Sequence, residues 1–250
     1  MIPPQPPRAA VEFGEKDRFA EQAQFVSLRW GEVSALFVRP PEPSAMLAFA
    51  HGAGAGIEHP FMSDMAQRLA GRGIASFRYH FPYMEARALS GRRRPPDRPP
   101  VLVETVRAAV AKAGRLADGL PLLAGGKSMG GRMTSTAASE APLPGVRGLV
   151  FFGFPLHAPG RPERAAERAA HLSGVALPML FLQGTRDALA RLDLIEDTCA
   201  SLGPLATLHR LDGADHSFRV LKRSGRTNEE AADDAADRVS AWTTRLYTSA

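Results

Sequence analysis

The sequence predicts an α/β fold in which a mostly parallel central sheet carries helices on both faces. Two observations lead to this prediction. Short apolar runs, such as residues 46–50 and 179–183, recur between glycine- and proline-containing breaks, and segments with helical spacing of apolar residues separate them. Continuous apolar runs are typical of strands buried on both faces, and strands that alternate with helices form parallel sheets.

The first expected element is an antiparallel β-hairpin at one edge of this sheet. Residues 25–30 and 33–38 alternate apolar and polar side chains, and they flank Gly31-Glu32, which we expect to form the turn. A proline-rich segment then ends the pattern.

Strands and helices alternate after the hairpin. The strands are expected at residues 46–50, 74–79, 120–126, 146–152, 179–183 and 206–211. The helices are expected at about residues 60–72, 101–116, 129–140, 161–172, 190–202 and 228–247. Glycines end the first helix, and Glu229 and Glu230 favour the start of the last one because acidic side chains stabilise a helix N-terminus.

Residues 21–250 are predicted to form a single domain with no large cap domain. Residues 1–20 are expected to be a flexible tail, since their proline-rich start lacks the apolar core of a signal peptide. Residues 84–100 are expected to be an exposed basic loop, because their prolines interrupt both helical and sheet hydrogen bonding.

Composition excludes several classes of protein. The hydrophobic content of 44% and charged content of 23% are those of a globular protein, and no apolar run is long enough to span a membrane. The net charge of +5 is too small to indicate nucleic-acid binding by itself. The single cysteine, Cys199, excludes an internal disulfide and fits a reducing compartment. We therefore expect a soluble cytoplasmic protein that binds neither membrane nor nucleic acid.

A serine motif stands between a predicted strand and a predicted helix. Gly126-Lys127-Ser128-Met129-Gly130 matches G-x-S-x-G, and this strand–turn–helix context is the one that the motif requires of a nucleophile. The serine lies on a sharp turn, where glycines two residues before and after it relieve crowding. Ser128 is thus the candidate catalytic nucleophile.

A serine hydroxyl needs a general base, and candidates follow in the required order of serine, acid and histidine. Asp187 comes after strand 179–183, and His216 comes after strand 206–211. Since ligand sites of such sheets lie at the carboxyl ends of the strands, we expect His216 to accept the serine proton and Asp187 to orient His216. Asp215 and Asp193 remain as rival acids, although Asp215 adjoins His216 and should point elsewhere.

Backbone N–H groups are expected to bind the negative oxygen of the tetrahedral intermediate. The predicted donors are those of Met129, directly after the nucleophile, and of Ala53 in the glycine-rich loop 51–56. His51, Gly52 and His157 are predicted to line the substrate site. The other histidines are expected to have structural roles.

A nucleotide site is not expected. Glycines 52, 54 and 56 do not match G-x-G-x-x-G, and Gly126-Lys127-Ser128 lacks the first glycine of a phosphate-binding loop because Pro121 occupies that position. No metal and no cofactor are predicted.

Four segments together resemble the α/β-hydrolase superfamily: 51–56, 126–131, 184–187 and 215–218. More narrowly, Gly125–Arg132, Pro155-Leu156-His157 and Leu182–Asp187 resemble a small branch related to dienelactone hydrolases, the KANL3/Tex30-like hydrolases. The resemblance covers about residues 25–247 and implies an α/β-hydrolase fold and the same Ser128, Asp187 and His216 assignment. Dienelactone hydrolases proper use a cysteine nucleophile, so Ser128 argues against that particular activity.

The predicted function is therefore that of a serine hydrolase, a carboxylesterase or thioesterase that forms an acyl-Ser128 intermediate on small-molecule substrates. The alternative is an interaction module that keeps the fold without useful turnover. A third hypothesis, phosphate binding by Arg87 and the arginines of residues 92–98, is disfavoured by the interleaved prolines.

Overall fold

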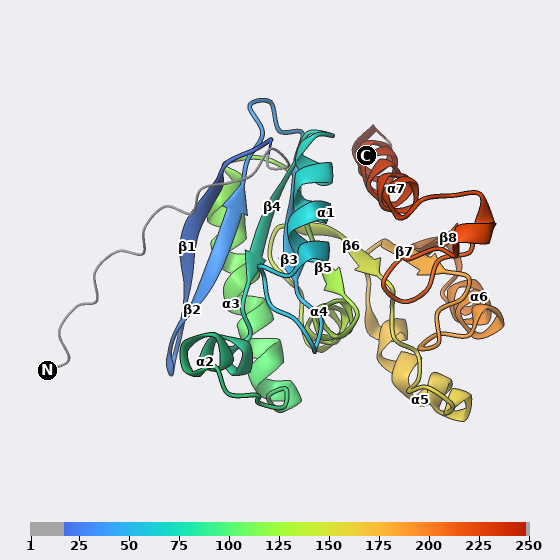
Figure 1. Cartoon of the computed structure of the whole chain (residues 1–250). Helices are drawn as coiled ribbons and strands as arrows, with labels where there is room; N and C mark the ends of the chain where they lie inside the picture. The colour runs from blue at the N-terminus through green and yellow to red at the C-terminus, as the bar shows by residue number, and fades with distance from the viewer. Residues whose placement is uncertain (1–17, 249–250) are drawn as a thin grey trace, which may run out of the picture.

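A computed structural model describes residues 18–248, and within that range eight strands form one sheet (Figure 1). The strand order is β1-β2-β4-β3-β5-β6-β7-β8. The strands are β1 (Glu21–Leu28), β2 (Gly31–Val38), β3 (Ala45–Ala50), β4 (Ile74–Tyr79), β5 (Leu122–Lys127), β6 (Val146–Phe152), β7 (Met179–Gly184) and β8 (Ala206–Leu211). β1 and β2 are antiparallel to each other and β2 is antiparallel to β4, whereas β3 to β8 are all parallel.

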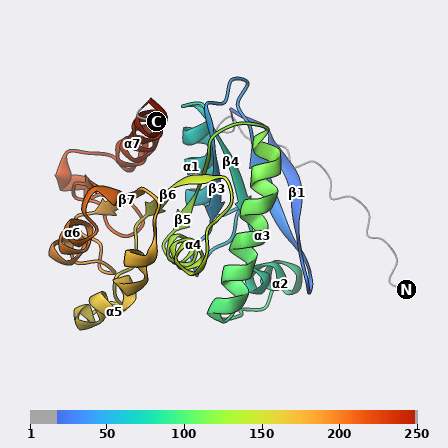
Figure 2. The same ribbon diagram turned by 180° about the vertical axis from the view of Figure 1, so that it is seen from behind.

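Helices cover both faces of the sheet. The elements are α1 (Pro60–Ala70), α2 (Pro82–Ser90), α3 (Pro99–Ala117), α4 (Met129–Glu140), α5 (Ala165–Ala169), α6 (Leu192–Ser201) and α7 (Asn228–Thr248). α1 and α7 pack together on one face (Figure 1), while α3 and α4 pack on the other, which faces the viewer in Figure 2. The predicted α/β-hydrolase fold with an N-terminal antiparallel hairpin is confirmed, and residues 18–248 contain no cap domain.

Two cores, one on each face, explain the continuous apolar strands. In β3, Met46 and Ala48 belong to the core under α3 and α4, whereas Leu47 and Phe49 belong to the core under α1 and α7. Alternate side chains of a strand point to opposite faces, so a sheet covered on both sides needs apolar residues at every position.

Two local predictions are wrong. Residues 84–90 belong to α2 rather than to an exposed loop: α2 starts with a proline, ends at Gly91 with φ of 67°, and buries Tyr83 and Met84. Proline suits the first turn of a helix, and the left-handed conformation suits glycine after its end. The hairpin turn lies at Arg29-Trp30 rather than at Gly31-Glu32, since Leu28 pairs with Gly31.

Most of the predicted N-terminal tail lies outside the described residues. Phe19, within it, exchanges two backbone hydrogen bonds with the Gln67 side chain, at 2.9 and 2.8 Å. No helix among residues 18–248 is long and apolar enough to cross a membrane.

The parallel register aligns the carboxyl ends of the strands along one edge of the sheet. Ala50 pairs with Gly126, Lys127 with Phe152, and Gly184 with Leu211. The loops that follow β3, β5, β6, β7 and β8 therefore meet at this edge, where ligand sites of open parallel sheets form.

Candidate active site

Ser128 occupies a strained turn between β5 and α4. Its φ of 51° and ψ of −117° lie in a region that non-glycine residues rarely adopt. Neighbouring glycines make the turn feasible: a Cβ on Gly126 or Gly130 would lie 2.5 or 2.6 Å from the carbonyl oxygen of Ala50. This turn conformation places the Ser128 side chain at the end of β5, clear of the neighbouring strands.

The structure brings Ser128, His216 and Asp187 together in one hydrogen-bonded chain. The Ser128 Oγ lies 2.9 Å from His216 Nε2, and His216 Nδ1 lies 2.7 Å from Asp187 Oδ2. A carboxylate only accepts, so the proton of a neutral His216 lies on Nδ1, and Nε2 is left to accept from the hydroxyl. The side chains come from sequence positions up to 88 residues apart.

The Asp187 side chain is fully buried and receives two further hydrogen bonds. Gln183 Nε2 donates to Oδ2 at 2.6 Å, and the backbone N–H of Leu189 donates to Oδ1 at 2.7 Å. Gln183 is itself fixed, because its Oε1 accepts from the backbone N–H of Phe154 at 2.9 Å. This network satisfies a buried charge and fixes the carboxylate toward His216.

The rival acids have other partners. Asp215 Oδ1 accepts from the backbone N–H groups of Ser217 and Arg219 at 2.8 and 3.0 Å, so it stabilises the turn after His216. Asp193 pairs with Arg191 at the exposed start of α6. Neither carboxylate forms a hydrogen bond with the His216 ring, whose partners are Asp187 and Ser128.

The loop after β3 is fixed by two buried side chains. His51 Nδ1 donates to the carbonyl oxygen of Gly52 at 2.7 Å, and His51 Nε2 accepts from the backbone N–H of Phe81 at 3.0 Å. Burial lowers the pKa of His51 to about 3, so the imidazole is neutral at ordinary pH. The Tyr83 hydroxyl donates to the carbonyl oxygen of Ala53 at 2.9 Å, and burial raises the Tyr83 pKa, which keeps it protonated.

The peptide between Gly52 and Ala53 is oriented by its carbonyl oxygen, that of Gly52, which accepts from His51 Nδ1 at 2.7 Å and from the Tyr83 hydroxyl at 3.3 Å. A trans peptide holds its C=O and N–H in opposite directions, so the Ala53 N–H points away from His51. Gly52 lies against the nucleophile, since a Cβ placed on it would be 3.7 Å from Ser128 Cβ. Met129 is the first residue of α4, where a backbone N–H has no partner within the helix.

His157 fixes a second loop in the same manner as His51. Its Nδ1 donates to the carbonyl oxygen of Ala158 at 2.9 Å, and its Nε2 accepts from the backbone N–H of Arg191 at 3.0 Å. His51 and His157 were both predicted to line the substrate site. Each is buried with both ring nitrogens bonded to backbone, so each imidazole fixes a loop.

The remaining histidines have separate partners. His59 caps α1 by accepting from the backbone N–H of Phe61. The other three pair with side chains: His80 with Glu85, His171 with Ser135, and His209 with Asp234.

The motif residue Lys127 is buried beside the hydrogen-bonded chain. Its Nζ donates to the carbonyl oxygen of His216 at 2.5 Å and lies 5.4 and 5.3 Å from the ring centres of Phe61 and Phe218. Burial lowers the pKa of Lys127 to about 8, an effect that the carboxylates of Asp187 and Asp215 oppose.

A family model described as an alpha/beta hydrolase domain matches residues 43–244. The chain belongs to this family. The matched residues include Ser128, Asp187, His216 and the loop after β3.

Solved structures share the hydrolase fold over nearly the whole chain. A dienelactone hydrolase from Anabaena variabilis is 24% identical with a TM-score of 0.70, covering 91% of this chain and 98% of that one. A serine hydrolase from Xanthomonas campestris, described as lacking a lid, is 19% identical with a TM-score of 0.66, covering 89% and 94%. An esterase domain from Rhodothermus marinus is 16% identical with a TM-score of 0.65, covering 90% and 98%. At these identities the similarity establishes the fold.

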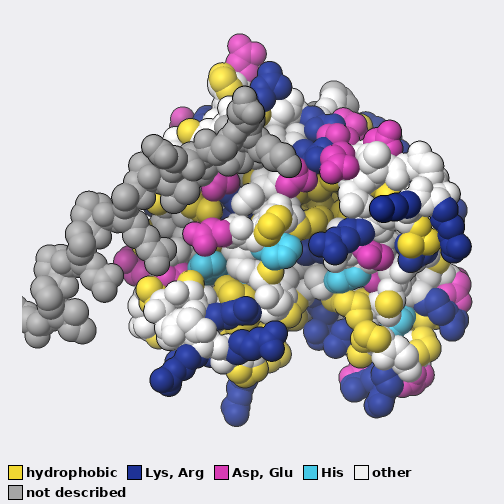
Figure 3. Space-filling model, viewed as in Figure 1, with side chains coloured by type: hydrophobic (Ala, Val, Ile, Leu, Met, Phe, Trp, Pro, Cys, Tyr) yellow, Lys and Arg dark blue, Asp and Glu magenta, His cyan; other side chains and the backbone are white. Residues whose placement is uncertain are grey.

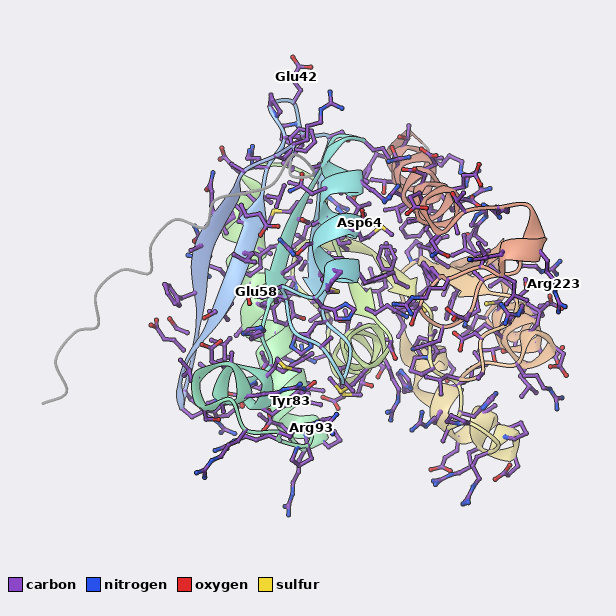
Figure 4. The ribbon with its side chains drawn as sticks, in the orientation of Figure 1. Glu42, Glu58, Asp64, Tyr83, Arg93 and Arg223 are labelled. Carbon is purple, nitrogen blue, oxygen red and sulfur yellow. The ribbon has the colours of Figure 1, made fainter. Side chains whose placement is uncertain are left out.

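A cavity of about 340 Å³ lies between the loop after β3 and α2 of this hydrolase. Gly54, Ala55 and Gly56 form one side, and Met84 and Ala88 of α2 form part of the other. Figure 4 labels Tyr83 and Glu58 in this part of the molecule, and Figure 3 shows basic side chains at its lower edge, where Figure 4 labels Arg93. Among the described residues, no group of histidine, cysteine and acidic side chains has the arrangement of a metal site.

Three residues at this site were not predicted. Gln183 contacts Asp187, Tyr83 contacts the loop after β3, and Lys127 contacts His216. Lys127 stood inside the serine motif, at a position that the motif leaves open, and Gln183 is a polar residue that ends an apolar run. Those two offered a signal, whereas Tyr83 lies between the predicted strand 74–79 and the predicted loop 84–100, where no element was expected.

Proposed function

We propose that this hydrolase-family chain is a serine hydrolase that cleaves carboxylic esters, thioesters included, through an acyl-Ser128 intermediate. The observation that carries the proposal is the hydrogen-bonded chain from Ser128 Oγ to His216 Nε2, at 2.9 Å, and from His216 Nδ1 to Asp187 Oδ2, at 2.7 Å. This arrangement can move a proton from a hydroxyl to an imidazole that a buried carboxylate keeps in the required tautomer.

In the first half-reaction, Ser128 Oγ forms a bond to the substrate carbonyl carbon while His216 Nε2 takes the hydroxyl proton. The carbonyl electron pair moves to oxygen and gives a tetrahedral intermediate. When this collapses, the bond to the leaving alcohol or thiol breaks, and His216 returns the proton to the leaving atom. Asp187 stabilises the intervening imidazolium.

In the second half-reaction, water replaces the leaving group. His216 removes a proton from the water, the oxygen attacks the acyl carbon, and the proton returns to Ser128 as the acid leaves. Because the His216 side chain is 23% exposed, it can meet this water.

The N–H groups of Met129 and Ala53 are the proposed donors to the negative oxygen. Support comes from the free helical N-terminus at Met129 and from the orientation of the Gly52–Ala53 peptide described above. Each such donor contributes about 10²–10³-fold to the rate in related chemistry.

The cavity between Gly54–Gly56 and α2 is the proposed site for one side of the ester. Its wall at Gly54–Gly56 belongs to the same loop as Gly52, which lies against Ser128, and its volume suits a small acyl or alcohol group. The dienelactone hydrolase and esterase neighbours fit this substrate class. We further propose that the chain belongs to the dienelactone-hydrolase-related, KANL3/Tex30-like branch that its motifs resemble.

A set of p-nitrophenyl esters of increasing acyl length tests the proposal. Wild type is expected to hydrolyse the shorter esters. Where the acyl-enzyme accumulates, nitrophenol should be released in an initial burst, and Ser128→Ala is expected to lose this activity. Equal activity of folded wild type and Ser128→Ala would contradict the proposal. A folded wild type inactive on every ester would favour the interaction module.

A further inference from the structure

Lys127 is a buried cation whose partners all belong to the surroundings of His216. Its Nζ donates to the His216 carbonyl oxygen at 2.5 Å and lies over the rings of both Phe61 and Phe218. Phe218 follows His216 by two residues, and Phe61 and Phe218 contact each other edge to face with ring centres 5.5 Å apart. The amine and the two rings therefore confine the segment that carries His216.

The Lys127 amine is also close to the imidazole. A Cβ on Gly153 would lie 2.9 Å from Lys127 Nζ and 3.3 Å from His216 Nδ1. The two nitrogens are thus no more than about 6 Å apart, a distance at which two charges in a partly desolvated site interact appreciably. A positive charge at Nζ opposes a positive charge on the imidazole.

Packing alone does not require an amine at this position. Burial of an ammonium costs free energy, and the lowered pKa of Lys127, about 8, reflects that cost. A methionine side chain would pack against the same two rings without a charge. The charged groups that face Lys127 are Asp187, from the loop after β7, and Asp215, from the loop after β8, which also brings the titratable ring of His216 near. α1 and the loop after β6 contribute the uncharged Phe61 and Gly153.

We propose that Lys127 is a positioning residue for the base: its amine holds the His216 backbone, and its charge opposes a second positive charge on the neighbouring imidazole. The inference rests on the proposed function, because it assigns to Lys127 a role in the same proton transfer. It predicts that loss of the amine harms turnover without harming the fold.

Three variants separate the two parts of the inference. Lys127→Met removes the charge and the hydrogen bond, Lys127→Gln keeps an N–H donor without the charge, and Lys127→Arg keeps both. Lys112→Met, a partly exposed lysine on α3, is the matched control for loss of one positive charge.

We expect Lys127→Met to be at least as resistant to urea as wild type at pH 7, with kcat lowered about 10-fold and KM nearly unchanged. The acid limb of its kcat/KM profile should move up by about half to one pH unit. Lys127→Gln should show the same shift with a smaller loss of kcat, and Lys127→Arg should restore the acid limb. Lys112→Met should match wild type.

An NMR titration of the His216 ring gives a readout that does not depend on turnover. Protonation of the ring at a higher pH in Lys127→Met than in wild type supports the inference. The same titration curve in both proteins overturns it, as does a Lys127→Met variant with wild-type kcat and acid limb. Failure of wild type to hydrolyse any ester contradicts the proposed function instead, and the ring titration still decides the role of Lys127.

Discussion

His51 follows β3 and His216 follows β8, at the same edge of the sheet, yet their surroundings differ in kind. Both ring nitrogens of His51 bond to backbone, at Gly52 and Phe81, and the side chain is buried. Both ring nitrogens of His216 bond to side chains, at Asp187 and Ser128, and the ring reaches solvent. An imidazole between two backbone groups fixes a loop, whereas one between a carboxylate and a hydroxyl can exchange a proton.

The largest effect that follows from this comparison concerns His216. His216→Ala should lower kcat/KM by about 10⁴-fold or more, because no other described base contacts Ser128, while the free energy of unfolding changes by no more than about 1 kcal/mol. His209→Ala, which removes a partly buried histidine paired with Asp234, is the matched control and should retain activity. Ester kinetics and urea unfolding check both. A His216→Ala variant within tenfold of wild type would contradict the assignment.

Replacing His51 should reduce stability more, and turnover less, than replacing His216. His51→Ala leaves the backbone N–H of Phe81 and the carbonyl of Gly52 without their partner, so we expect a loss of about 2–4 kcal/mol in stability. Turnover should fall about 10²-fold, because the Ala53 N–H loses its orientation. Unfolding curves and kcat measured on the folded fraction test this. Unchanged stability would show that the His51 bonds do not fix the loop.

The low pKa of His51 predicts a pH dependence of stability. The unfolded chain binds a proton at His51 near pH 6.5, but the folded protein resists it until about pH 3, so acid favours unfolding. Between pH 6.5 and 4.5 this group alone should lower the free energy of unfolding by about 2–3 kcal/mol. A His51→Gln variant should lack that component. If the free energies of unfolding of wild type and His51→Gln changed equally with pH, this contribution of His51 would be ruled out.

Tyr83 acts on the same loop through one hydroxyl. Tyr83→Phe removes the hydrogen bond to the Ala53 carbonyl and keeps the packing of the ring, so kcat should fall about tenfold with little change in KM. Tyr247→Phe, on α7, provides the control for loss of a tyrosine hydroxyl from a distant helix. Equal kcat values for the two variants would argue against an effect of Tyr83 on the loop.

The smallest effect concerns the cavity beside α2. Ala88→Trp should fill part of it and raise KM a few-fold for longer acyl esters, while short esters are affected less. Leu89→Trp changes the neighbouring, 69% exposed side chain outside the cavity and should leave KM unchanged. A chain-length series on both variants is the measurement. Identical KM values would place the substrate elsewhere.

The sequence predicts most of this architecture because local signals and the global fold agree. Buried parallel strands require continuous apolar runs, and the turn at Ser128 requires the glycines at 126 and 130, so both could be recognised without coordinates. The order of Ser128, Asp187 and His216 likewise follows from strand order alone.

What could not be predicted depends on register and on packing across strands. Lys127 reaches the His216 carbonyl oxygen over 89 sequence positions, and Gln183, beside Asp187, is held by the backbone N–H of Phe154 from the loop after β6. α2 was missed because the prolines after it dominate the local pattern, whereas burial of Tyr83 and Met84 stabilises the helix.

Labelling with a fluorophosphonate probe tests the central claim most directly. The probe phosphonylates a serine only when a neighbouring base removes the hydroxyl proton, so wild type should gain one adduct, located by peptide mass spectrometry at Ser128. Ser128→Ala should gain none, and His216→Ala should react far more slowly. A folded wild type that gains no adduct, or gains it at another residue, would contradict the account.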